Sequence, residues 1–186
     1  MKFSIFISLY FVVMVAAARG VYQRPNAFID QVFEHQKPTT KFVWLTKDIK
    51  TQTQQILGHP YQKLRIKYWQ KGNLTAWILN EIGKEEPITV GILVESQTSK
   101  SPKSSKIKLL KVLEYRESRG DEVRHEFFTS QFKNISLNAQ SKLDQSVDGI
   151  TGATLSVNAL KRLSRLALFL TGSIHHGKEG SNASIE

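Results

Sequence analysis

The sequence contains no cysteine. This absence excludes disulfide bonds, thiolate metal sites, iron–sulfur clusters, thiol catalysis, c-type haem attachment and lipid attachment at an N-terminal cysteine. The sequence also lacks an internal repeat, and its composition is not typical of a disordered chain. Redox chemistry, if the protein carries it out, must therefore depend on another cofactor.

The chain has 186 residues, 40% of them hydrophobic, which suits one compact domain with a real core. Its formal net charge of +10 favours acidic partners such as anionic membrane surfaces, phosphate-bearing ligands or acidic redox proteins. The positive residues are scattered and no nucleic-acid-binding motif is present. We therefore expect no nucleic acid among the partners.

Residues 1–20 are typical of an export signal, with Lys2 ahead of an apolar run over residues 3–18 and small residues at the cleavage region. The run is shorter than the roughly 20 residues that a membrane-spanning helix needs. An uncleaved N-terminal membrane anchor stays open as an alternative. We expect the protein to work in the periplasm or another extracytoplasmic location.

The spacing of apolar residues predicts two N-terminal helices, over residues 26–36 and 45–57. Strand patterns follow at residues 64–70, 74–80, 88–96 and 106–115, with a polar loop over residues 97–105.

A short amphipathic helix is expected over residues 123–132, and a long helix from about residue 153 to about residue 170. Residues 172–186 are polar and are expected to be a disordered tail. The order predicts an α+β fold with N-terminal helices, an antiparallel sheet meander and a C-terminal helix packed on the sheet.

The most informative segment is residues 146–160, with the sequence SVDGITGATLSVNAL. Gly149 and Gly152 permit close backbone approach, and the strongest helical pattern of the chain follows them. Unpaired N–H groups at a helix start bind phosphate well. Hydroxyl side chains cluster there, at Thr151, Thr154 and Ser156. The alternative is that Asp148 and Thr151 merely cap the helix.

The stretch DGITGAT resembles the flavinylation motif D-x-x-S/T-G-A-T of the FMN-binding domain family. That family includes the C subunit of the sodium-pumping NADH:quinone reductase and the G subunit of the Rnf complex. In it, a flavin transferase that uses FAD and Mg²⁺ esterifies the last Thr of the motif with the phosphate of FMN. The resemblance implies covalent FMN on Thr154. The residues that carry it are Asp148, Gly149, Ile150, Thr151, Gly152, Ala153 and Thr154, followed by Leu155 and Ser156.

A second stretch, ESRG at residues 117–120, resembles an upstream loop of the same family that approaches the flavin. It implies that Glu117 and Gly120 lie near the cofactor. The resemblance covers about residues 88–170, so we expect residues 88–171 to form the FMN-binding core. Residues 21–87 would supply the N-terminal helices and first strands of the same domain.

A flavin ring needs an apolar wall, for which Trp77, Tyr68 and Trp69 are the candidates. An aromatic residue in such a strand is more often a core residue than a cofactor wall, so a place in the core is the alternative for each. Three arginines are close in sequence to residues 117–120 and would either stabilise negative charge on the flavin or lie in solvent: Arg116, Arg119 and Arg124.

The resemblance implies an exported electron-transfer protein with no catalytic residue of its own, because the cofactor carries the chemistry. Its partners would be the flavin transferase and a membrane or exported electron donor and acceptor. Two alternatives remain: a small extracytoplasmic flavin-dependent reductase with its own substrate, and a non-redox anion-binding module. The histidines are isolated or lie in the tail, so no metal site is expected.

Overall fold

The computed structural model describes residues 20–96 and 105–179. The expected export signal before residue 20, most of the expected loop over residues 97–105 and the last seven residues of the expected tail lie outside these ranges. No helix within the described ranges is long and apolar enough to cross a membrane.

Six strands of the described chain form one antiparallel sheet in the order β1-β6-β5-β4-β3-β2. Their bounds are β1 (Gly20–Val21), β2 (Thr39–Trp44), β3 (Arg65–Lys71), β4 (Leu74–Ile82), β5 (Pro87–Ser96) and β6 (Ser105–Tyr115). The helices are α1 (Pro25–Val32), α2 (Lys47–Leu57), α3 (Glu126–Thr129) and α4 (Thr154–Glu179), with the 3₁₀ turns η2 (Asp121–Arg124) and η3 (Ser130–Phe132).

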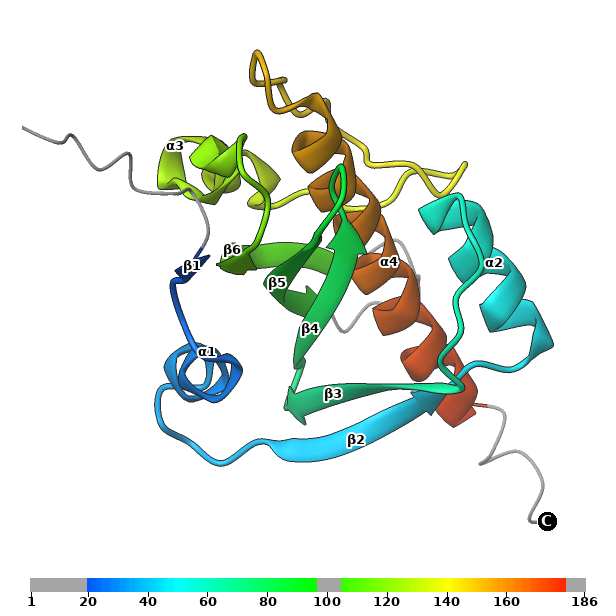
Figure 1. The fold of residues 1–186 in the computed structure, drawn as a ribbon. Helices are drawn as coiled ribbons and strands as arrows, with labels where there is room; N and C mark the ends of the chain where they lie inside the picture. The colour runs from blue at the N-terminus through cyan, green and yellow to red at the C-terminus, as the bar shows by residue number, and fades with distance from the viewer. Residues whose placement is uncertain (1–19, 97–104, 180–186) are drawn as a thin grey trace, which may run out of the picture.

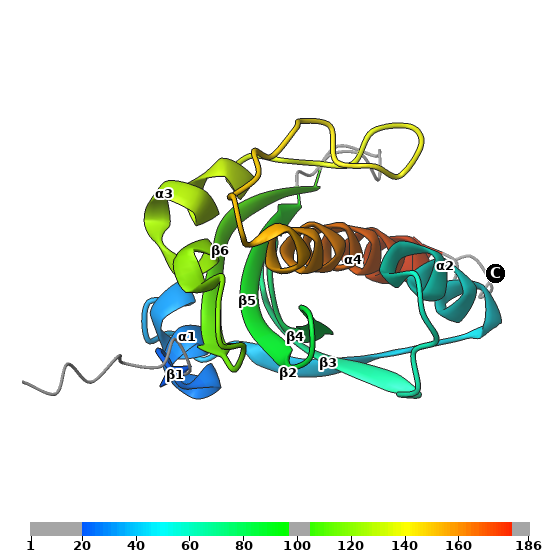
Figure 2. The same ribbon diagram turned by 45° about the horizontal axis from the view of Figure 1, so that its top comes forward.

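The sheet curves around α4, which lies along its concave inner face (Figures 1 and 2). The apolar stripe of α4 packs there with inward-facing residues of the strands, so that Val157, Leu160 and Leu163 are at most 2% exposed. Helix α2 packs against α4 beyond the sheet. The predicted α+β fold, with an antiparallel sheet and a C-terminal helix packed on it, is confirmed.

The outer face of the sheet has a second, smaller core. Phe28, Ile29 and Phe33 of α1 and the residue after it pack against Ala76, Leu93 and Leu113 of β4, β5 and β6. Gly91 makes this approach possible, since a Cβ at that position would lie 2.7 Å from the Phe28 ring. Helix α1 therefore covers one half of the outer face.

Several elements differ from the sequence expectations. Strand β1 was not predicted, and the helix expected over residues 123–132 is divided into η2, α3 and η3. Strand β2 was not predicted, because its apolar side chains divide between the two faces of the sheet: Val43 is buried, whereas Phe42 and Trp44 are exposed. Helix α4 continues to Glu179 and not to about residue 170. Thr171, the last residue expected to belong to the FMN-binding core, is fully buried in this helix.

Candidate functional site

The segment DGITGAT forms the turn that leads into α4. The Ala153 N–H donates to the Ile150 carbonyl oxygen at 3.0 Å, and Thr154 is the first residue of the helix. Gly152 has φ +83°, a conformation that side chains rarely tolerate. A Cβ on Gly149 or Gly152 would meet no atom within 4 Å, so the space in front of the turn is open.

An open pocket of about 550 Å³ lies beside this turn. The structure thus brings the two stretches singled out in the sequence together, although they are separated by some thirty residues of chain. The pocket is lined by Lys84, Glu117, Ser118, Arg119, Gly152, Ala153, Thr154, Leu155 and Ser156. Thr154 and Leu155 are exposed, whereas Ala153 and Ser156 are buried.

Gly120 and Tyr115 fix the helix start against β6. Tyr115 donates its hydroxyl proton to the Arg119 carbonyl oxygen, and its Oη lies 2.8 Å from Ser156 Oγ. Because the tyrosine proton is already engaged, Ser156 is the donor of the second bond. Gly120 has φ +87°, and a Cβ there would lie 2.9 Å from Tyr115 Oη and 3.2 Å from Ser156 Oγ. The lack of a side chain at the predicted site residue Gly120 therefore leaves room for the contact between Tyr115 and Ser156.

Glu117 anchors the turn between β4 and β5. Its buried Oε1 accepts the backbone N–H groups of Lys84, Glu85 and Glu86 at 2.5, 2.7 and 3.0 Å. Burial by itself would raise the pKa of Glu117, but these three hydrogen bonds and the charge of Lys84 together outweigh it and hold the pKa below its usual value. Glu117 therefore lines the pocket as an ionised carboxylate whose Oε1 already accepts three hydrogen bonds.

Of the three arginines considered from the sequence, only Arg119 lines the pocket. Arg116 is paired with Glu114 and donates to the Pro87 carbonyl oxygen. Arg124 pairs with Asp121 at 3.1 Å and lies over the Tyr22 ring. The second cation of the pocket, Lys84, was missed, because it is brought there only through the hydrogen bonds of its turn to Glu117.

Trp77, expected as a wall for a flat cofactor, does not line the pocket. It is fully buried, its ring lies 5.0 Å from that of Tyr68, and its Nε1 donates to Thr171 Oγ1 at 2.9 Å. Tyr68 is in the same core, and Trp69 belongs to the opposite face of the sheet. The candidate aromatic wall is thus corrected to a core role, and Leu155 and Ala153 supply apolar surface in the pocket.

The capping alternative is not what the structure shows. In the described part of the chain, neither the Asp148 nor the Thr151 side chain hydrogen bonds to α4, and both are exposed. The Asp148 backbone N–H donates to Gln131 Oε1 at 2.8 Å, which ties the loop to η3. Ile150 is half-buried and packs against the main core.

These residues fit a phosphate-bearing cofactor. The N–H groups of the first helical turn have no acceptor within the helix, and the helix dipole adds positive potential at the same point. Lys84 and Arg119 add two cationic side chains at the pocket. The volume of about 550 Å³ lies within the range of small-molecule sites.

Comparison with protein families gives one match: the model of the FMN-binding domain matches residues 83–168. The matched region includes Glu117, Gly120, the whole DGITGAT turn and most of α4. Comparisons with curated proteins and with solved structures give no match.

Proposed function

Because residues 83–168 belong to the FMN-binding domain family, we propose that this chain is an exported electron-transfer protein that carries FMN covalently on Thr154. One observation carries the assignment of the attachment site. Thr154 is the exposed first residue of α4 and lines the pocket that fits a phosphate-bearing cofactor. Its hydroxyl is available to a modifying enzyme, whereas that of Ser156 is buried and bound to Tyr115.

The attachment reaction would be a transfer from FAD. A bond forms between Thr154 Oγ1 and the phosphorus of the FMN phosphate, and the pyrophosphate bond of FAD breaks. AMP leaves, and the hydroxyl proton of the threonine is released with it. The partner is therefore a flavin transferase that uses FAD and Mg²⁺.

The remaining residues would hold the cofactor. The open N–H groups at the α4 start would bind the phosphate, and Leu155 would offer apolar surface to the ring. Lys84 and Arg119 favour negative charge in the pocket. When bound, FMN supplies reversible one- or two-electron transfer, so the chain needs no acid or base of its own. The donor and acceptor would be membrane or exported redox proteins.

A carrier is favoured over a reductase by the chemistry of the pocket. Its one acidic side chain is Glu117, and Oε1 of that carboxylate is taken up by three backbone N–H groups. No further acid, and no histidine, is among the pocket residues within the described chain. A redox titration of the flavin-loaded protein with physiological donors tests this step, and a flavin that cannot be reduced and reoxidised would rule the carrier out.

The first experiment is the intact mass of the protein produced with an active flavin transferase. We expect the wild type to be heavier than its polypeptide by one FMN minus one water, and Thr154→Ala to show the bare polypeptide mass. The mass of the processed protein also reports whether residues 1–20 are removed.

Two controls sharpen this test. Thr154→Ser keeps a hydroxyl at the helix start and is expected to retain the modification. Fragmentation of the modified peptide in a tandem mass spectrometer distinguishes Thr154 from Thr151, the other exposed threonine of the turn. A wild type with the bare mass beside an active transferase would overturn covalent attachment, and a modified Thr154→Ala would overturn the attachment site.

A further inference from the structure

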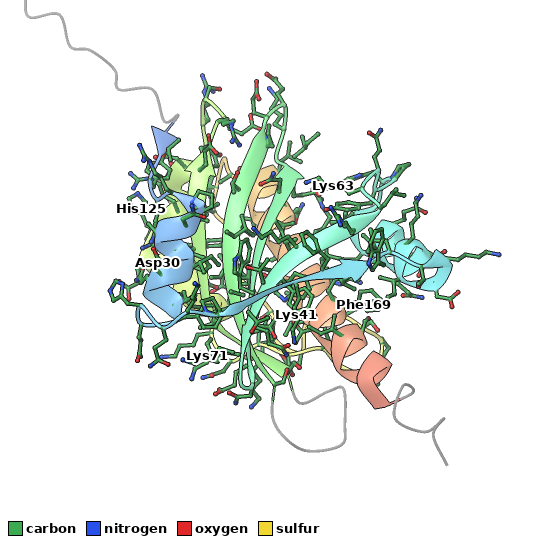
Figure 3. The ribbon with its side chains drawn as sticks, turned by 90° about the horizontal axis from the view of Figure 1, so that it is seen from below. Asp30, Lys41, Lys63, Lys71, His125 and Phe169 are labelled. Atoms are coloured by element: carbon green, nitrogen blue, oxygen red, sulfur yellow. The ribbon has the colours of Figure 1, made fainter. Side chains whose placement is uncertain are left out.

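The outer face of β2 and β3 is left open. Helix α1 covers the outer face over β4, β5 and β6 and reaches β3 only at Trp69, which packs partly against its core, so most of the outer face of β2 and β3 has no described helix over it (Figures 1 and 3). Figure 3 views the molecule from this side, with Lys63 and Lys71 near the two ends of β3. We call this surface the β2–β3 face, defined by Phe42, Trp44, Arg65, Lys67 and Trp69.

Large apolar side chains are exposed on this face. Phe42 is 44% exposed and Trp44 is 59% exposed. Cations lie over the rings: the Arg65 guanidinium is 4.3 Å from the Phe42 ring centre, and Lys67 Nζ is 4.7 Å from that of Trp69. Aromatic rings and long basic side chains thus alternate across the two strands.

The charge of the face has one sign. Between Asp48 and Glu81 the sequence contains no Asp or Glu. A groove of about 450 Å³ runs along the face. Among its lining residues are the cations Lys63, Arg65 and Lys67 and the aromatics Phe42, Tyr61 and Trp69.

We propose that the β2–β3 face binds the surface of a membrane that contains anionic lipids. Exposed Trp and Phe side chains flanked by Lys and Arg are what an interfacial membrane-binding surface requires: the apolar groups enter the headgroup region and the cations meet the lipid phosphates. A protein partner fits less well, because lysine is depleted at protein–protein interfaces. A uniform positive charge complements the spread negative charge of such a membrane.

The placement of the face suits the rest of the molecule. The start of α4, where the pocket lies, is at the opposite end of the molecule from β2 and β3, while the later turns of α4 approach these strands (Figure 1). A protein seated on lipid through the β2–β3 face would keep its pocket directed away from the membrane. The cofactor site would then stay open to other proteins.

Flotation with lipid vesicles tests the proposal on the full-length protein, purified in the form that its host exports. Binding to vesicles of phosphatidylcholine alone gives a baseline that includes any contribution of residues 1–20. We expect added phosphatidylglycerol to strengthen binding. The double variant Arg65→Gln with Lys67→Gln is expected to reduce this gain in binding about fivefold for each charge removed. Raising the salt concentration is expected to weaken the same gain.

Matched variants separate the face from the overall charge. Lys133→Gln with Lys142→Gln removes the same charge from exposed positions outside this face and is expected to leave binding unchanged. Phe42→Ala with Trp44→Ala is expected to weaken binding, whereas Phe127→Ala, which removes an aromatic side chain that is 65% exposed elsewhere, is not. Unchanged thermal unfolding shows that each variant is folded.

Three results would overturn the proposal: no gain from phosphatidylglycerol, equal losses in the face and control charge variants, or no loss in either variant of the face. The charge and aromatic variants are independent, so poor folding of one leaves the other decisive. The test does not depend on flavin attachment, because the apo-protein and the loaded protein have the same face.

Discussion

Two parts of α4, its first turn and the turn around Thr171, differ in how their polar groups are placed: the first is exposed and the second is buried and hydrogen bonded. At its start, Thr154 is exposed on a pocket, and the first-turn N–H groups have no acceptor within the helix. Further along, Thr171 is fully buried, accepts from Trp77 Nε1 at 2.9 Å and donates to the Ala167 carbonyl oxygen at 2.8 Å. The buried turns hold the helix in place, so its first turn can remain open to a ligand and keep its position.

The largest expected effect on this contrast is at Gly120, which packs against the start of α4. In Gly120→Ala the new Cβ would sit 2.9 Å from Tyr115 Oη at φ +87°. Backbone strain and the close contact together are expected to lower the free energy of unfolding by about 3 kcal/mol. Chemical denaturation measures this loss, and flavin loading of the same variant should fall because the helix start shifts.

Gly58→Ala is the matched control for that variant. Gly58 has a similar φ of +80°, but a Cβ there would meet nothing within 4 Å. Only the backbone term of about 1 kcal/mol is expected. Equal losses in the two variants would mean that the contact with Tyr115 does not constrain the site.

Thr171→Val tests the buried part of α4. The substitution keeps the shape but leaves the Trp77 N–H without an acceptor, which is expected to cost about 2 kcal/mol. Thr53→Val is the control, because Thr53 is also fully buried and its hydroxyl has no partner in the described part of the chain. We expect no loss there by thermal or chemical unfolding, and a loss as large as that of Thr171→Val would contradict the role given to the Trp77 bond.

The smallest expected effect is at Glu117, whose lowered pKa makes its contribution depend on pH. Its stabilisation is fully present above the unfolded pKa of about 4.3 and is lost as the pH falls through the lower folded pKa. Glu117→Gln is expected to cost about 1 kcal/mol at neutral pH, since the bonds to Lys84, Glu85 and Glu86 are no longer charge-assisted. Unfolding of both proteins at decreasing pH should show the difference shrinking below about pH 4. A constant difference would mean that the carboxylate charge is not involved.

Much of the fold could be predicted from local sequence patterns. The four strands from residue 64 onward alternate or are rich in β-branched residues, and each was expected within a few residues of its bounds. The end of α4 could not be predicted, because the apolar stripe stops at Leu170. The helix continues beyond it, and contacts such as that of Thr171 with Trp77 stabilise it there. That contact joins residues far apart in sequence, so local periodicity carries no trace of it.

The site was readable where a turn and a helix start are encoded locally. Gly152, Ala153 and Thr154 of DGITGAT line the pocket as the sequence indicated, whereas the first four residues of the stretch, Asp148 to Thr151, do not. The roles of Trp77 and Lys84 could not be predicted. The sequence alone does not distinguish a core tryptophan from a cofactor wall, and Lys84 reaches the pocket through a carboxylate 33 residues away. The single helix expected over residues 123–132 is divided into shorter turns, and Phe127 within it is exposed.

The strand order also bears on how copies of the chain behave at high concentration. The outer edge of β6 is covered by β1 at one end and by the backbone of Asn134 and Ile135 at the other. The opposite edge is β2, which is six residues long, follows Pro38 and carries Lys41. Short edges with proline and lysine resist pairing with strands of other molecules. Solutions of the folded protein should therefore resist strand-mediated aggregation.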